Sequence, residues 1–354
     1  MDFVRRLIRQ DIQQLSAYAV PDATGLTKLD AMENPYPAPD IVQQQWQSLA
    51  DLPINRYPDP GARALTAAIK QSLNTDQAIL LGNGSDEIIL HLCIALAAGS
   101  TVLSTGPSFV MYQMIAMQQH LRYIEVDLQA DFSLDLPVML DTVLQQQPSL
   151  IFLACPNNPT GNLFDRQAVE QIIQAADGLI VIDEAYTAFA ETSYIDLLGQ
   201  YDNVLVMRTL SKLGLAGLRL GYAVAHPALI HELDKVRMPY NINRFTQAAA
   251  LIALQHASAF NEQAELICQQ RTRLINALEK VFQVFSTQTN FVLVKTQSGQ
   301  AGWWFEQLLK HGSLIKNMHG KHALLTDCLR ITVGTDVENS QLLSVIKQLQ
   351  VSLS

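Results

Sequence analysis

The sequence predicts an α/β protein: a large domain with a mostly parallel central sheet flanked by helices, and a smaller α/β domain towards the C-terminus. Up to about residue 245, short apolar runs rich in branched residues alternate with helical patterns, which is typical of helices packed on a parallel sheet. The runs are apolar throughout, as expected of strands covered on both faces. They are AILL (78–81), TVLST (101–105), LIFLA (150–154), LIVID (179–183) and NVLVM (203–207). Such sheets bind ligands at the carboxyl ends of their strands, so we expect the functional side chains there.

Two further segments flank this unit. Residues 1–40 end in the proline-rich stretch 33–39, where the prolines forbid a regular helix, so we expect an irregular, extended arm. After residue 246 a long helical pattern leads to FVLVK (291–295), a helix near 301–311 and LRITV (329–333). The sequence therefore predicts an arm over 1–40 that packs with the small domain, a large domain over 41–245 and a small C-terminal domain over 246–354.

Composition narrows the class of protein. The 354 residues are 49% hydrophobic and 16% charged, the balance of a globular protein large enough for two domains. A formal net charge of −9 disfavours a broad nucleic-acid surface, which needs surplus Lys and Arg. The N-terminus has no apolar stretch of signal-peptide kind and no run reaches the length of a bilayer, so a cytoplasmic location is expected.

Cysteine and histidine spacing gives little sign of a metal centre. The cysteines are too widely spaced for a zinc knuckle or a dithiol centre, and we expect reduced, mostly buried thiols at Cys93, Cys155, Cys268 and Cys328. His319 and His322 have a spacing compatible with a metal ion, yet no Asp, Glu or Cys lies close beside them in the sequence. The expectation is a solvated loop and no metal site.

The first candidate motif, Gly82-Asn83-Gly84-Ser85-Asp86-Glu87, follows the AILL strand and precedes a helical run. Ser85 or Asp86 can cap that helix, and its free N–H groups and positive dipole end form a natural phosphate seat. A dinucleotide-binding turn would need a third glycine where Glu87 stands, so we set that interpretation aside. Taken alone, the segment fits a tight turn with an ordinary cap as well as it fits an anion site.

The second motif, Asp183-Glu184-Ala185-Tyr186, begins at the end of the LIVID strand. A carboxylate there loses hydration and needs a partner, which a ring nitrogen that must stay protonated would supply. A strand-end Asp also binds magnesium in nucleotide hydrolases. The chain has no Gly-x-x-x-x-Gly-Lys-Ser/Thr loop to accompany it, which disfavours that alternative.

The third motif, Arg208-Thr209-Leu210-Ser211-Lys212, follows the NVLVM strand and leads to Arg219. Burial and nearby cationic charge would lower the pKa of Lys212 and leave an amine ready to form a Schiff base. Ser211 and Arg219 are suited to hold a dianionic phosphate. Taken alone, a Ser-Lys pair is more often a solvated helix cap.

The fourth motif, Cys155-Pro156-Asn157-Asn158-Pro159-Thr160-Gly161, follows the LIFLA strand. Its prolines and glycine fix the loop, so that Asn157 would present its amide to a ligand at the same sheet edge as Asp183 and Lys212. A simple Asx turn is the alternative.

In this order and at these separations, the four motifs resemble the fold-type I family of pyridoxal phosphate enzymes over nearly the whole chain. GNGSDE, CPNNPTG, DEAY, TLSK and LAGLR are similar to the motifs of histidinol-phosphate aminotransferases, as are MENPYP, NRYPDP, MPYNIN and LRITVGT. The resemblance implies transfer of an amino group between L-histidinol phosphate and 2-oxoglutarate, giving imidazole acetol phosphate and L-glutamate, in histidine biosynthesis. An aromatic amino-acid aminotransferase and a threonine-phosphate decarboxylase share the fold and stay open as alternatives.

The resemblance also implies roles for single residues. Lys212 would bind pyridoxal 5'-phosphate covalently and then move the proton of the substrate carbon. Asp183 would keep the pyridine nitrogen protonated, Asn157 and Tyr186 would bond the ring hydroxyl oxygen, and Phe109 would stack on the ring. The groups implied at the cofactor phosphate are the backbone of Gly84, Ser85 and Asp86, the side chains of Thr209, Ser211 and Arg219, and Tyr57 of a partner subunit.

Since Tyr57 would act across an interface, the resemblance implies a homodimer, with the arm also packing on the partner. The implied substrate contacts are Tyr18, Asn34, Lys316 and Arg330, with Arg330 on the substrate's anionic group. Two positions depart from the family pattern. The interval from Lys212 to Arg219 is one residue shorter than in many relatives, and Lys316 stands where an arginine is common, which keeps the charge but loses the bidentate fork.

Overall fold

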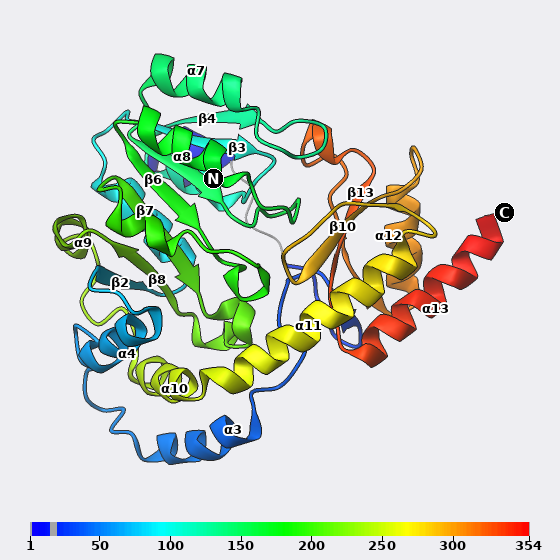
Figure 1. Ribbon diagram of the computed structural model, residues 1–354, viewed down its shortest axis with the longest axis horizontal. Coiled ribbons are helices and arrows are strands. Elements are labelled where there is room, and N and C mark those ends of the chain that lie inside the picture. Colours follow the sequence, from blue (N-terminus) through cyan, green and yellow to red (C-terminus); the bar gives the residue numbers. More distant parts are fainter. Residues whose placement is uncertain (1, 15–19, 354) are drawn as a thin grey trace.

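The computed structural model describes residues 2–14 and 20–353 and contains a seven-stranded sheet in the order β2-β8-β7-β6-β5-β3-β4 (Figure 1). The strands are β2 (Ala78–Gly82), β3 (Thr101–Gly106), β4 (Arg122–Asp127), β5 (Leu150–Ala154), β6 (Leu179–Asp183), β7 (Val204–Thr209) and β8 (Gly221–Ala225). β8 runs antiparallel to both of its neighbours, and the other pairs are parallel. The predicted fold class, a mostly parallel sheet flanked by helices, is confirmed.

All five predicted runs are strands of this sheet. The sheet also contains two strands that were not predicted, because neither is a continuous run of branched apolar residues. β4 (RYIEVD) is an edge strand in which only Val126 is buried, so charged residues interrupt its apolar pattern. β8 (GYAVA) is fully buried, but its glycine and two alanines have low strand propensity and interrupt the run of branched residues.

Helices cover both faces of the sheet. One face is covered by α3 (Asp40–Trp46), α4 (Arg63–Leu73), α7 (Leu136–Gln146), α8 (Arg166–Ala175) and α10 (Arg244–Gln255). The other is covered by α5 (Ser85–Ala95), α6 (Met111–Gln118) and α9 (Pro227–Asp234). Successive residues of one strand enter opposite cores; Ile151 and Leu153 of β5 pack in the first and Leu150 and Phe152 in the second. Since helices cover both faces, a ligand can reach the sheet at the edge where the carboxyl ends of the parallel strands lie.

A second, antiparallel sheet of four strands is formed towards the C-terminus, in the order β12-β13-β10-β9. Its strands are β9 (Gln283–Val284), β10 (Phe291–Lys295), β12 (Lys316–Asn317) and β13 (Cys328–Thr332). It packs with α11 (Ala257–Leu278), α12 (Ala301–Lys310) and α13 (Asp336–Leu353). In Figure 1, α11 runs diagonally from beside α10 to this second sheet. The long helical stretch of the sequence is thus two helices, α10 and α11, divided at His256.

The N-terminal segment is only partly as expected. The prediction of an irregular arm is wrong at the N-terminus, where the chain forms two short helices, α1 (Asp2–Leu7) and α2 (Gln10–Gln14). β1 (Thr27–Lys28) pairs in parallel with β11 (Ser313–Leu314), which ties this segment to the C-terminal part. The proline-rich stretch 33–39 lies between β1 and α3 without regular structure, as its prolines require. Within the described residues, no helix is both long and apolar enough to cross a membrane.

Candidate active site

The predicted strand-end residues meet at one edge of the large sheet. Asp183 is the last residue of β6, and Lys212 follows the end of β7. Arg219 precedes β8, which begins at the same edge because it is antiparallel; its Gly221 pairs with Thr209 of β7 and Gly82 of β2. A cavity of about 210 Å³ lies here, which we call the strand-end cavity. Its lining includes Ser85, Asp86, Phe109, Asp183, Tyr186, Thr209, Ser211, Lys212 and Arg219, all predicted, and Met32, Glu33, Tyr112 and Asn158, which were not.

One end of the strand-end cavity is suited to an anion. Gly84 precedes α5 with φ +87°, and a Cβ atom added there would lie 2.6 Å from Nη2 of Arg219, so the guanidinium lies against this glycine. The N-terminus of α5 adds free N–H groups and the positive end of the helix dipole. Arg219 Nη2 lies 3.6 Å from Asp86 Oδ2, but both side chains are about half exposed, so this pair contributes little to stability. Arg219 itself has φ +49°, a left-handed conformation with which the chain turns back into β8 within the shortened interval after Lys212.

Lys212 lies in the short 3₁₀ turn Ser211–Leu213, between the sheet and the N-terminal segment. Its Nζ donates a hydrogen bond to the carbonyl oxygen of Ala31 at 3.4 Å and lies 5.8 Å from the ring centre of Tyr186. Burial, followed by the charge of Arg330, lowers the pKa of Lys212 to about 8, although Glu33 and Asp86 act in the opposite direction. The lowered pKa makes the neutral, nucleophilic amine a minor but accessible form near neutral pH, roughly a tenth of the molecules at pH 7.

Asp183 is a buried carboxylate facing the same cavity, with 4% of its surface exposed. Oδ1 accepts a hydrogen bond from the backbone N–H of Ala185 at 3.0 Å, and Oδ2 accepts one from the hydroxyl of Tyr112 at 2.6 Å. Burial raises the pKa of Asp183 to about 6, against the lowering effect of these two hydrogen bonds. The site thus pairs an acid and an amine whose pKa values are shifted towards each other.

Asn157 does not line the cavity, unlike its neighbour Asn158. It is fully buried, and its amide donates to the carbonyl oxygen of Pro107 at 2.9 Å and to Thr160 Oγ1 at 2.7 Å, while its own oxygen accepts from Ser108. Of the strand-end side chains predicted to meet a ligand, those at 183, 212 and 219 line the strand-end cavity and the one at 157 does not. The position of Asn157 at a ligand ring stays a prediction.

A second cavity of about 500 Å³ adjoins the first, with Met32, Phe109 and Asn158 lining both. Arg330 on β13 and Lys316 on β12 are paired across these strands and line it together with Lys321, His322 and one acidic residue, Glu125. Because the cationic groups outnumber the carboxylate, we call it the basic cavity. Arg330 donates to Asn158 and, at 2.9 Å, to the carbonyl oxygen of Asp30, and its guanidinium lies 5.3 Å from the ring centre of Phe291. The substrate residues predicted at 316 and 330 therefore face a cavity beside Lys212 and not the strand-end cavity itself.

Three other predicted residues lie elsewhere. Asn34 lines neither cavity; its amide donates to the carbonyl oxygen of Leu213 and to Gln263, and its oxygen accepts from the N–H of Tyr36. These bonds anchor the loop and leave a substrate contact by Asn34 without support. Tyr57 is 77% exposed on the surface and lines neither cavity. Tyr18 lies outside the described residues.

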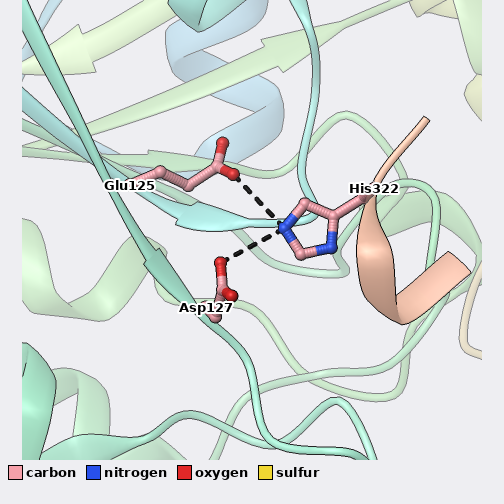
Figure 2. Close-up of side chains that lie close together, drawn as sticks. All are labelled: Glu125, Asp127 and His322. Atoms are coloured by element: carbon pink, nitrogen blue, oxygen red, sulfur yellow. Dashed lines mark hydrogen bonds and ion pairs between the residues drawn. The ribbon is translucent and has the colours of Figure 1, made fainter. Parts of the chain in front are cut away.

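Figure 2 shows His322 beside Glu125 and Asp127 of the edge strand β4. His322 Nε2 lies 3.2 Å from Asp127 Oδ1 and 3.5 Å from Glu125 Oε1. Its Nδ1 accepts the N–H of Leu324, so a neutral imidazole carries its hydrogen on Nε2 and donates it to the carboxylates. The expectation of a solvated loop is wrong here, because carboxylates about 195 positions away pack against His322, whose side chain is 16% exposed.

Comparison with known proteins agrees with this geometry. Residues 24–346 match the family model described as aminotransferase class I and II. The chain is 48% identical over 352 residues to histidinol-phosphate aminotransferase 2 of Nitrosococcus oceani, and 48% identical over 351 residues to the histidinol-phosphate aminotransferase of Chromobacterium violaceum, covering 98% of each chain in both cases. It is also similar to the histidinol-phosphate aminotransferase structure from Sinorhizobium meliloti in complex with pyridoxal-5'-phosphate, with a TM-score of 0.89, 26% identity and 98% of each chain covered. The chain belongs to the class I and II aminotransferase family.

Proposed function

We propose that this chain is a pyridoxal phosphate-dependent aminotransferase that interconverts L-histidinol phosphate and 2-oxoglutarate with imidazole acetol phosphate and L-glutamate, in histidine biosynthesis. The names of its relatives at 48% identity support this activity. The observation that carries it is the strand-end cavity, where an amine of lowered pKa and a buried carboxylate lie beside an anion seat. The adjoining basic cavity is suited to a substrate that carries a phosphate ester.

The residues of the strand-end cavity fit pyridoxal phosphate by their chemistry. Gly84 leaves room for Arg219 to approach the N-terminus of α5, where a phosphate group would be held, with Ser211 and Thr209 adding hydroxyl donors. Asp183 supplies the negative charge that a protonated pyridine nitrogen needs, and Lys212 supplies the amine. When bound, the cofactor provides an electron sink for the substrate carbon.

The side chains of the two cavities would perform the proton transfer and hold the cofactor and the substrate in place. Lys212 Nζ would serve as the anchor of the cofactor and as the base that moves the proton from the substrate carbon. Phe109 lines one side of the cavity, and Tyr186, 4% exposed, lies near Lys212, where its hydroxyl would donate to the ring hydroxyl oxygen of the bound cofactor. Arg330 and Lys316 orient the substrate through its anionic group, which excludes substrates that lack one.

The substrate assignment is tested by half-reactions of the cofactor-loaded protein with histidinol phosphate, tyrosine and threonine phosphate. We expect histidinol phosphate to convert the visible absorbance of the bound cofactor fastest and to release imidazole acetol phosphate. Lys316→Gln should raise the histidinol phosphate concentration for half-maximal conversion by roughly 10-fold, because a hydrogen bond to a charged group is lost. Lys347→Gln removes an exposed lysine of α13 instead and serves as the control. Faster conversion by tyrosine would overturn the substrate assignment, and carbon dioxide release from threonine phosphate would indicate a decarboxylase.

We also propose a homodimer in which Tyr57 reaches the phosphate seat of the partner subunit. Tyr57 stacks on Tyr240 with ring centres 4.4 Å apart, and Arg244 donates to its carbonyl oxygen, which joins the segments 54–57 and 238–245. Both segments expose large apolar side chains, at Ile54, Tyr57, Met238, Tyr240 and Phe245. Exposed apolar surface of this kind favours a protein contact. Sedimentation of the active protein should give a dimer, and a fully active monomer would contradict the proposal.

We infer an arm (1–40), a large domain (41–245) and a small domain (246–354), supported by the two separate sheets that fall within the last two ranges. We infer a cytoplasmic location, supported by the free thiols of all four cysteines, three of them buried.

A further inference from the structure

Tyr112 is a buried phenol that contacts the cavity carboxylate and has no role in the sequence motifs. It lies in α6, with no surface exposed, and its hydroxyl donates to Asp183 Oδ2 at 2.6 Å. The other oxygen of Asp183 is held by the N–H of Ala185 at 3.0 Å. The carboxylate therefore receives one fixed donor on each oxygen.

Aromatic packing fixes where the Tyr112 hydroxyl lies. The ring stacks on Phe152 of β5 with centres 4.4 Å apart and planes 4° apart, and Phe109 lies edge-on to it at 5.5 Å. A tyrosine has only two side-chain torsions, and both are restrained by these contacts. Tyr112 thus links the ring of Phe109, which faces both cavities, to the orientation of Asp183.

We propose that Tyr112 is a positioning residue that holds Asp183 ionised and correctly oriented towards the ring nitrogen of the cofactor. The proposal rests on the use of pyridoxal phosphate proposed above. A hydrogen bond to a carboxylate favours its charged form, and this one opposes the burial that disfavours charge. Loss of the donor would weaken the partner that keeps the ring nitrogen protonated.

Tyr112 acts as a donor and not as a base. Burial, then the nearby charge of Asp183, raises its pKa well above the ordinary value, so the phenol stays protonated throughout the working range. Its effect on the reaction is therefore exerted through Asp183.

The sign of the pH effect follows from the groups around Asp183. Tyr112 from α6 and the N–H of Ala185 lower its pKa, while burial and the charges of Asp86 and Glu184 raise it, to about 6 from the ordinary 3.8. For a carboxyl whose folded pKa is raised, ionisation costs stability, so the contribution of Asp183 to the free energy of unfolding of the cofactor-free chain falls as pH rises from about 4 through about 6. Removing the Tyr112 hydroxyl raises this pKa further and extends the fall to higher pH.

The test compares wild type with Tyr112→Phe and with Tyr194→Phe. Tyr194 is a matched control, because it is also buried and its hydroxyl donates to the carbonyl oxygen of Phe164, outside both cavities. In the cofactor-loaded protein, we expect Tyr112→Phe alone to shift the pH titration of visible absorbance and to lower kcat roughly 10-fold with KM little changed. In the cofactor-free chain, Tyr112→Phe, but not Tyr194→Phe, should extend the pH range over which the free energy of unfolding falls to higher pH. Titrations that overlay those of wild type in both measurements would overturn the proposal.

A second variant covers the case in which Tyr112→Phe does not fold. Incorporation of 3-fluorotyrosine at position 112 keeps the ring and strengthens the donor, so the same two titrations should shift in the opposite direction; no shift would overturn the proposal. Failure of the proposed role of Tyr112 can be distinguished from failure of the proposed function. A wild-type protein that binds no pyridoxal phosphate refutes the function, whereas a wild type that binds it, with unshifted variants, refutes only the role of Tyr112.

Discussion

Replacing Lys212 with alanine is expected to lower turnover by about 10⁴-fold or more, at or beyond the upper end for loss of a positioned general base. Lys212 has two proposed roles that an alanine cannot perform, covalent attachment of the cofactor and movement of the substrate proton. Its amine is suited to both because burial and Arg330 lower its pKa to about 8. The anion seat formed by α5 and Arg219 is untouched, so the variant should still hold the cofactor noncovalently.

Steady-state turnover with histidinol phosphate measures this effect, and circular dichroism checks the fold. Lys347→Ala, in the exposed surface of α13, is the matched control and should keep wild-type turnover. Turnover of Lys212→Ala within a few-fold of wild type would refute the assignment of the base.

Asp183→Asn is expected to lower turnover by roughly 10²- to 10³-fold, the size of effect seen when a preorganised electrostatic group is removed. The two side chains have nearly the same shape, but the amide has no charge with which to keep a ring nitrogen protonated. Because ionised Asp183 costs stability above its pKa of about 6, the cofactor-free variant should be at least as stable as wild type at pH 8. Activity and stability should therefore change in opposite directions.

Turnover and denaturant unfolding, both at pH 8, measure these two effects in the same samples. Asp196→Asn provides the control, since Asp196 is an exposed partner of Arg166 outside the strand-end cavity. If Asp183→Asn lost activity only in proportion to lost stability, its role would be structural, and the electrostatic account would fail.

The fold and most of the strand-end cavity could be predicted because both depend on patterns local in the chain. Apolar runs identify buried strands, and parallel strands bring their ends, including Asp183 and the turn at Lys212, to one edge. Arg219 also lies at this edge, because β8, which follows it, runs antiparallel to β7.

What could not be predicted depends on contacts between distant segments. Tyr112 reaches Asp183 across 71 positions through the packing of α6 on β5, which no spacing rule encodes. His322 meets Glu125 and Asp127 only because the loop after β12 crosses the edge strand β4. Asn157 and Asn34 donate their amides to the carbonyl oxygens of Pro107 and Leu213, contacts with distant segments that the motifs did not indicate.

The central claim is that Lys212 is the amine that bonds to the cofactor in the strand-end cavity. It is tested most directly by reducing the cofactor-loaded protein with borohydride, digesting it, and locating the phosphopyridoxyl group by mass spectrometry. We predict one modified peptide with the group on Lys212. Modification of a different lysine, such as Lys316 of the basic cavity, or a loaded protein with no reducible bond, would contradict the claim.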